Sequence, residues 1–237
     1  FALLQPGLAV VRERAAERRI LIAIDVSQSM QTPDPQASDA EKLRWARALE
    51  TIGNDHNRDR LDQWLQALEN EQEPKWVESG DGEAATQLAQ TRRDSLHQLL
   101  DEIGALQRRE IVQRILTSTT TPLLAKLQRI GDVQIHLFAD KAVAVDGDAL
   151  SLMDLNEQEL GLNVGVTNLQ AGIAADPSSG EQPSTAGIVL LTDGRDTSTH
   201  DPIATARAHG RENIPLFPVL IGSPRNPIDI TVTDLDF

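Results

Sequence analysis

Residues 20–30 read Ile-Leu-Ile-Ala-Ile-Asp-Val-Ser-Gln-Ser-Met, an apolar run that ends in one acid and two alternating serines. A short continuous apolar run is typical of a strand that is buried on both faces of a parallel sheet. Asp25, Ser27 and Ser29 therefore follow the carboxyl end of that strand, which is the edge where open α/β sheets bind ligands. Several small oxygen ligands with one carboxylate among them suit a hard cation such as Mg²⁺.

The composition limits the classes of protein and of partner. The 237 residues are 40% apolar, so the chain can bury a full core, and we expect one domain with embellishments. Lys and Arg total 22 against 36 Asp and Glu, a net charge of −14. That charge repels phosphate backbones and anionic lipid surfaces, so nucleic acid is not an expected partner. The absence of cysteine excludes a disulfide, a thiolate metal site and a cysteine nucleophile.

Strand-like runs recur along the chain and alternate with helix-like runs. After the first run, further strands are predicted at residues 133–138, 142–145, 187–192, 216–221 and 228–235. Helices are predicted from near Glu41, from Thr167 to Ala175, and from about Pro202 to His209, with a loop at 146–165 and a link at 177–183. This alternation predicts an α/β fold with a Rossmann-like, doubly wound, mostly parallel central sheet flanked by helices.

A polar helical segment at residues 53–118 is longer than a crossover between strands requires. Its apolar residues fall at helical spacing and predict two or three amphipathic helices, separated by residues 73–82. One interpretation is a helical hairpin that covers the sheet or its edge; the other is a surface that binds a partner. Exposure of Trp76, which lies among Gly, Pro and acids, would favour the second interpretation.

Two later residues extend the candidate site beyond the first strand. Thr167 precedes a predicted helix, and Asp193 follows the predicted strand at 187–192 within Thr-Asp-Gly. Each motif alone has an ordinary structural explanation, because Asp, Ser and Thr are common turn and helix-capping residues. Together, three loops at the carboxyl edge of one parallel sheet can converge on a single cation. The combination is therefore more specific than its parts.

The order and context of these residues resemble the von Willebrand factor type A domain with its metal-ion-dependent adhesion site. That family has Asp-x-Ser-x-Ser after the first strand, a distant Thr, and a later Asp that is usually within Thr-Asp-Gly. Asp25, Ser27, Ser29, Thr167 and Asp193 match this pattern in order. The long loop after Met30 and the helical insert depart from it and bear on the usual partner surface.

The resemblance implies a cation held directly by Ser27, Ser29 and Thr167, with Asp25 and Asp193 acting mainly through water and hydrogen bonds. The cation would be Mg²⁺, or alternatively Mn²⁺ or Ca²⁺. Few direct anionic ligands leave such an ion electrophilic enough to take a carboxylate from a partner. The resemblance therefore implies a protein-interaction module rather than an enzyme, with a protein partner that supplies an Asp or Glu.

A narrower resemblance is to bacterial membrane-anchored members of the family, where a Leu-rich helix leads through a segment like residues 4–7 to the first strand. It implies a lead-in at residues 1–18 after a membrane span, the domain proper at 19–222, and a strand or linker at 223–237 before a further domain. The domain would then lie at the cell envelope, facing away from the cytoplasm. A cytoplasmic location is the alternative.

Two other functions are weighed against the interaction module. A Mg²⁺-dependent hydrolase could use the same acidic site, but neither serine lies in a Gly-x-Ser-x-Gly elbow, and no Gly-rich phosphate loop occurs. The five histidines show no metal-ligand spacing, and His200 is interpreted as a surface-loop residue. A degenerate structural scaffold with an empty site is the other alternative, although every ligand type is present.

Overall fold

The computed structural model describes residues 19–49, 55–77, 82–117, 123–145, 159–174 and 185–223. The lead-in at 1–18, most of the predicted loop at 146–165, the predicted link at 177–183 and the predicted strand at 228–235 lie outside these residues. Within the described part of the chain, no helix is both long enough and apolar enough to cross a bilayer.

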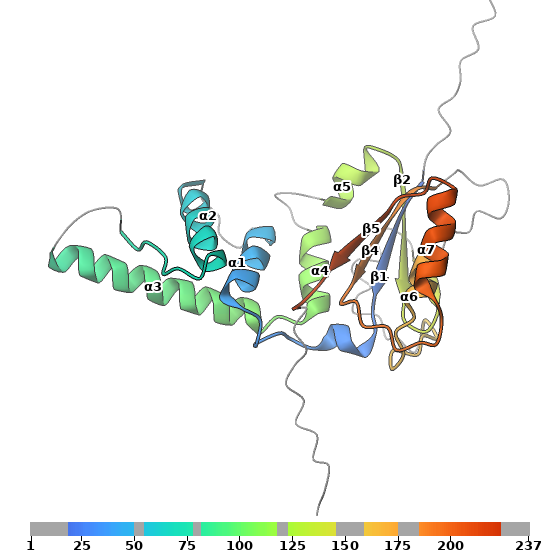
Figure 1. The fold of residues 1–237 in the computed structure, drawn as a ribbon, viewed down its shortest axis with the longest axis horizontal. Helices are drawn as coiled ribbons and strands as arrows, with labels where there is room; N and C mark the ends of the chain where they lie inside the picture. The colour runs from blue at the N-terminus through green and yellow to red at the C-terminus, as the bar shows by residue number, and fades with distance from the viewer. Residues whose placement is uncertain are drawn as a thin grey trace, which may run out of the picture.

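In the described residues, a five-stranded sheet forms the centre of the fold, in the order β3-β2-β1-β4-β5. Figure 1 labels four of these strands, β2, β1, β4 and β5. The strands are β1 (Arg19–Asp25), β2 (Asp132–Phe138), β3 (Ala142–Val145), β4 (Thr185–Thr192) and β5 (Leu216–Leu220). Only β3 runs antiparallel to its neighbour, β2; every other pairing is parallel. The predicted α/β class and mostly parallel sheet are therefore confirmed, and the arrangement is compatible with a Rossmann-like fold.

The strand register brings the polar ends of β1 and β4 to one edge of the sheet. Asp25 lies opposite Phe138 of β2, and Ile24 lies opposite Leu191 of β4. Every residue of β1 is buried, as the unbroken apolar run predicted. Asp25 and Thr192 thus end two adjacent parallel strands at the same level.

Helices cover both faces of this sheet. On one face lie α4 (Arg108–Thr117) and α5 (Leu123–Gln128), and on the other lie α6 (Leu169–Ala174) and α7 (Pro202–Arg211) (Figure 1). Ile22 and Ile24 pack with Val112 of α4 in one core cluster, while Phe138 packs with α6 in another. Gly172 permits the close approach of α6, because a Cβ there would lie 2.8 Å from the Phe138 ring.

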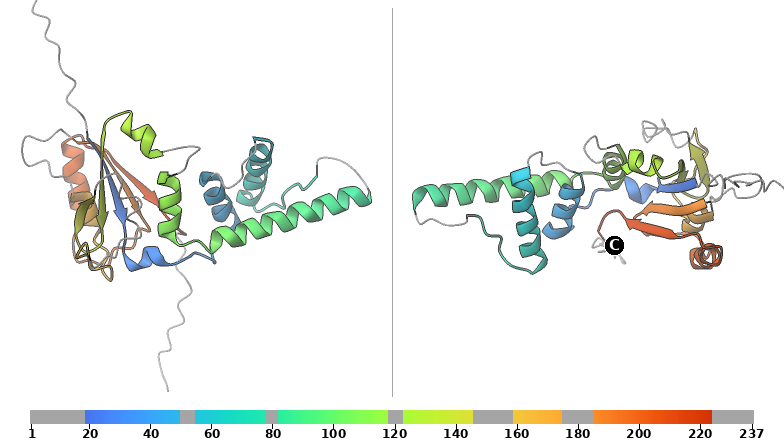
Figure 2. Two further views of the ribbon diagram at one scale, coloured as in Figure 1. Left: turned by 180° about the vertical axis from the view of Figure 1, so that it is seen from behind. Right: turned by 90° about the horizontal axis from the view of Figure 1, so that it is seen from above.

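Three further helices form an arm that projects away from the sheet (Figure 2). They are α1 (Asp39–Ala48), α2 (Asp55–Glu69) and α3 (Glu83–Gly104). The arm has its own apolar core, made of Leu43, Ala46, Leu61, Trp64, Leu65, Leu96, Leu100 and Ile103. The predicted insert at 53–118 therefore supplies α2 and α3 to the arm and α4 to the sheet.

Two local details of the arm follow from its sequence. Ser38 caps α1 through a reciprocal capping box with Glu41. Trp76 is half-buried rather than exposed: its ring centroid lies 5.3 Å from that of Trp64, and Arg93 lies over its face. Trp76 therefore packs the segment between α2 and α3 against the arm, so its environment does not favour a binding role for this residue.

Candidate metal centre

Asp25 is the most enclosed member of the candidate site, with no exposed surface. Its Oδ1 accepts a hydrogen bond from the Ser27 backbone N–H at 2.9 Å, and its Oδ2 accepts one from the Thr192 hydroxyl at 2.7 Å. Both carboxylate oxygens thus have a protein donor, which fixes the orientation of the group. A carboxylate that acts on a metal through water or through another ligand requires such a fixed orientation.

The burial of Asp25 also shifts its titration. Desolvation raises the pKa of the Asp25 carboxyl above its ordinary value, and the nearby charge of Asp193 raises it further. The hydrogen bonds from Ser27 and Thr192 oppose this rise but do not cancel it. A cation bound at this edge would stabilise the ionised form and relieve the cost of burying the charge.

The two serines present their hydroxyls side by side. The 3-10 helix η1 (Gln28–Gln31) begins just after Ser27, and Met30 anchors it in the core with no exposed surface. This tight turn places the Ser27 and Ser29 hydroxyl oxygens 3.0 Å apart. Ser27 is buried and Ser29 is half-buried, so the pair is only partly accessible to solvent. Two adjacent neutral oxygens of this kind can both contact one Mg²⁺.

Thr167 lies in a loop that is fastened to the other two loops of the site. The Val164 carbonyl accepts from the Gln28 N–H at 2.7 Å, and the Thr167 carbonyl accepts from the Thr197 N–H at 3.0 Å. Thr167 is buried, and no group among the described residues hydrogen-bonds its hydroxyl. The structure joins Thr167 to the serines and to Asp193 through these neighbours, not by direct contact.

The helix after Thr167 begins later than predicted. It starts at Leu169, because the Asn168 side chain caps it by accepting from the Ala171 N–H at 3.2 Å. The predicted helix start at Thr167 was therefore wrong by two residues. The physical reason is that Asn is the better capping side chain, which leaves the Thr167 hydroxyl out of the cap.

Asp193 follows β4 and meets a residue that sequence reasoning did not identify. Arg108, at the start of α4, donates from Nη1 to Asp193 Oδ2 at 2.9 Å and to the Ser29 carbonyl at 2.9 Å. The same guanidinium pairs with Asp34, with Nε 2.7 Å from Oδ2. Burial would lower the pKa of Arg108, but Asp34 and Asp193 outweigh it, so its pKa is raised and it stays charged.

The donor set suits a hard cation. Hydrogen bonds link Asp25 to Ser27 and to Thr192, and they link the Ser27 and Ser29 hydroxyls. Arg108 bridges Ser29 and Asp193, and Thr167 is linked to them through its loop. Ser27, Ser29 and Thr167 would hold Mg²⁺ directly, with the two carboxylates nearby. Within the described residues, no cluster of three or more His, Cys, Asp or Glu side chains is placed to share a metal. Any site here therefore depends on hydroxyl oxygens.

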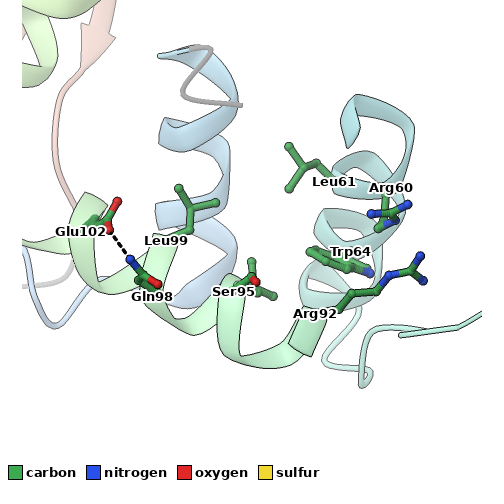
Figure 3. A pocket seen from close by; sticks show the side chains of 9 residues that line it. Arg60, Leu61, Trp64, Arg92, Ser95, Gln98, Leu99 and Glu102 are labelled. Carbon is green, nitrogen blue, oxygen red and sulfur yellow. Dashed lines mark hydrogen bonds between the residues drawn. The ribbon is translucent and has the colours of Figure 1, made fainter. Parts of the chain in front are cut away.

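A separate cavity of about 380 Å³ lies in the arm between α2 and α3 (Figure 3). Its lining combines apolar and charged side chains: Arg60, Leu61, Trp64, Arg92, Ser95, Leu96, Gln98, Leu99 and Glu102. None of the predicted site residues lines it. The Arg92 guanidinium donates to the Trp76 carbonyl, and Gln98 donates to Glu102 at 2.9 Å, so much of its polar lining is already engaged.

Comparison with known proteins identifies no relative. No protein-family model, curated protein or solved structure matches the chain. The geometry of the sheet edge is therefore the basis for proposing a function.

Proposed function

We propose that the chain is a metal-dependent protein-interaction module similar to the von Willebrand factor type A domain. In this proposal Ser27, Ser29 and Thr167 hold Mg²⁺, or Mn²⁺ or Ca²⁺, while Asp25 and Asp193 act through water and hydrogen bonds. The bound ion would supply one open coordination position for a carboxylate of a partner protein. The observation that carries the proposal is the pair of serine hydroxyls 3.0 Å apart, next to a fully buried aspartate that accepts from the Ser27 N–H.

The charge of the chain supports a metal-bridged contact. A net charge of −14 disfavours the approach of an acidic side chain to this protein. A divalent cation at the sheet edge would reverse the local sign and attract that same side chain. Partner recognition through an Asp or Glu is therefore physically coherent only when the cation is present.

The hydrolase alternative has less support in the geometry. A general base needs a carboxylate oxygen that is accessible to the proton it takes. Asp25 has no exposed surface, and both of its oxygens already accept hydrogen bonds. Asp193 Oδ2 is paired with Arg108, and its Oδ1 accepts from the Arg195 N–H at 3.1 Å.

The location at the cell envelope is a further part of the proposal. It rests on the sequence of residues 1–18, which lie outside the described residues. It is independent of the metal site, so a cytoplasmic location of the intact protein would leave the site unaffected.

The open coordination position can be tested with Mn²⁺ and a small carboxylate. Protein-bound Mn²⁺ enhances the relaxation of water protons, and a ligand that displaces its water reduces the enhancement. We expect acetate to reduce the enhancement and acetamide, which has the same shape without the charge, to leave it unchanged. Equal effects of acetate and acetamide would contradict the proposed binding of a partner carboxylate. A scaffold with an empty site would show no enhancement at all.

A further inference from the structure

Arg108 occupies an unusual position for a charged side chain. It is 2% exposed, although it opens a helix and carries a full positive charge. Its guanidinium contacts three groups at the sheet edge: the Asp34 carboxylate, the Asp193 carboxylate and the Ser29 carbonyl. An isolated buried charge is costly, so a guanidinium is retained here only with compensating partners.

The Asp34 and Asp193 carboxylates compensate the buried positive charge of Arg108. Arg108 in turn compensates the buried negative charge of Asp193. The Asp193 side chain is 3% exposed, and its charge raises the pKa of the buried Asp25. Arg195 is a weaker partner of Asp193, at 3.8 Å and with 36% of its side chain exposed. Without a bound metal, Arg108 is therefore the main positive charge that faces Asp193 from the described residues.

The fold holds Arg108 in place from the opposite side. Gly222 adopts φ +97°, and a Cβ there would lie 2.4 Å from the Arg108 Nε and 2.6 Å from the Asp34 Oδ2. Asp34 Oδ2 also accepts from the Ser223 N–H at 3.4 Å. The Arg108–Asp34 pair is thus enclosed by the chain that follows β5, and it does not depend on Asp193 for its geometry.

We propose that Arg108 is a built-in counter-cation for Asp193. When a divalent cation binds at Ser27 and Ser29, Arg108 releases Asp193 to that cation and keeps its own contacts with Asp34. This inference rests on the proposed function of the site. The guanidinium bonds to the Ser29 carbonyl, so it lies beside the expected position of the ion, and like charges this close repel. Arg108 would thereby keep the metal-free edge folded and weaken the hold on the cation.

The inference assigns a positioning role, and a purely structural role makes a different prediction. A structural residue would lower stability equally with and without metal when it is removed. Removal of a counter-cation lowers stability mainly when the metal is absent, because a bound metal replaces the lost charge. The difference between melting temperatures in Mg²⁺ and in chelator therefore separates the two roles.

The test uses the full chain and the variant Arg108→Met, which keeps an unbranched side chain without the charge. Arg114→Met is the matched control, because Arg114 is an exposed residue of the same helix. We expect Mg²⁺ to raise the melting temperature of Arg108→Met by more than that of wild type and Arg114→Met. Calorimetry should show Mg²⁺ binding to Arg108→Met roughly tenfold tighter, the size of effect that one adjacent charge has on an ionic equilibrium. Arg108→Lys, which retains the charge, should respond to Mg²⁺ as wild type does.

Each other outcome overturns the inference. Mg²⁺ binding by wild type with no larger gain in Arg108→Met overturns it and leaves the metal site intact. A variant that stays unfolded even in Mg²⁺ also overturns it, because the ion then cannot replace the guanidinium. No response to Mg²⁺ in any variant, wild type included, overturns both the inference and the proposed function.

Discussion

The carboxyl edge of the sheet and the helical arm differ in where their paired charged side chains lie. At the sheet edge, Asp25, Arg108 and Asp193 are all buried, and they are held by hydrogen bonds and by one another. In the arm, the ion pairs between described residues lie on the surface around an apolar core, and Lys42 of α1 is a buried charge beside it. These pairs are Arg44–Glu69, Arg47–Asp62 and Arg93–Glu73.

This difference bears on what each region contributes to stability. Surface ion pairs cost little and contribute little, so the arm owes its stability to its apolar core. Buried charges cost free energy even when they are paired, and apolar side chains would often serve stability as well. The charges at the sheet edge therefore point to a site, whereas the arm requires no such explanation.

The largest expected effect tests whether the two regions are separate cooperative units. Leu100 is 3% exposed in the arm core, and among the described residues only the partly buried Trp45, Leu49 and Leu106 belong to both clusters. We expect Leu100→Ala to cost about 2–5 kcal/mol of the opening free energy of the arm. Hydrogen exchange should show lost protection in α3 and nearly unchanged protection in β1.

The reciprocal variant completes that comparison. Ile24→Ala removes a fully buried side chain beside Asp25 and should reduce protection in β1 and β4 before the arm core is affected. If either variant reduced protection equally in both regions, the chain would unfold as one unit. The sheet edge and the arm would then not be separate cooperative units.

A smaller effect is expected from the hydroxyl that holds Asp25. Thr192→Val preserves the shape of the side chain but removes the donor 2.7 Å from the Asp25 Oδ2. A buried carboxylate that loses a donor should cost about 1–3 kcal/mol in the free energy of unfolding. Thr117→Val, an exposed site on α4, serves as the control and should change stability by about 0.5 kcal/mol or less. Denaturant titration measures both; equal losses would remove the special role of Thr192.

The smallest expected effect is a pH dependence confined to the sheet edge. Because burial raises the pKa of Asp25, the metal-free folded state binds its proton more tightly than the unfolded chain does. The ionised carboxylate therefore destabilises the folded state as the pH rises through the folded pKa. Asp25→Asn keeps an acceptor oxygen for the Ser27 N–H, and its amide nitrogen can donate to the Thr192 hydroxyl oxygen, so it should be more stable than wild type at neutral pH in chelator.

That advantage of Asp25→Asn should shrink as the pH falls toward the ordinary pKa of aspartate, because wild-type Asp25 then becomes neutral as well. Thermal unfolding in chelator across this range measures the difference. A difference that stayed constant with pH would show that Asp25 titrates as it does in the unfolded chain.

Local patterns in the sequence were sufficient to predict the sheet edge. β1 and β4 are buried on both faces, so they appear as unbroken apolar runs, and their polar ends follow directly in the chain. The capping box of Ser38 and Glu41 is equally local, since it spans four consecutive residues. These features depend on neighbours in sequence, which a single chain displays.

The features that were not predicted depend on contacts between distant residues. Arg108 lies 74 residues from Asp34 and 85 from Asp193, and nothing around it distinguishes it from the adjacent Arg109. The grouping of α1 with α2 and α3, and of α4 with the sheet, is also set by packing between apolar faces that look alike in sequence. The helix α5 is only six residues long, and it has no counterpart among the predicted helices.

Calorimetric titration of Mg²⁺ tests the central claim most directly. Wild type, Asp25→Asn and Asp101→Asn should be compared, since Asp101 is an exposed residue of α3 whose change removes the same charge far from the sheet edge. The account predicts that wild type and Asp101→Asn bind one Mg²⁺ with the same affinity, and that Asp25→Asn binds it about 10–100-fold more weakly. Equal binding by all three proteins, or no binding by wild type, would contradict it.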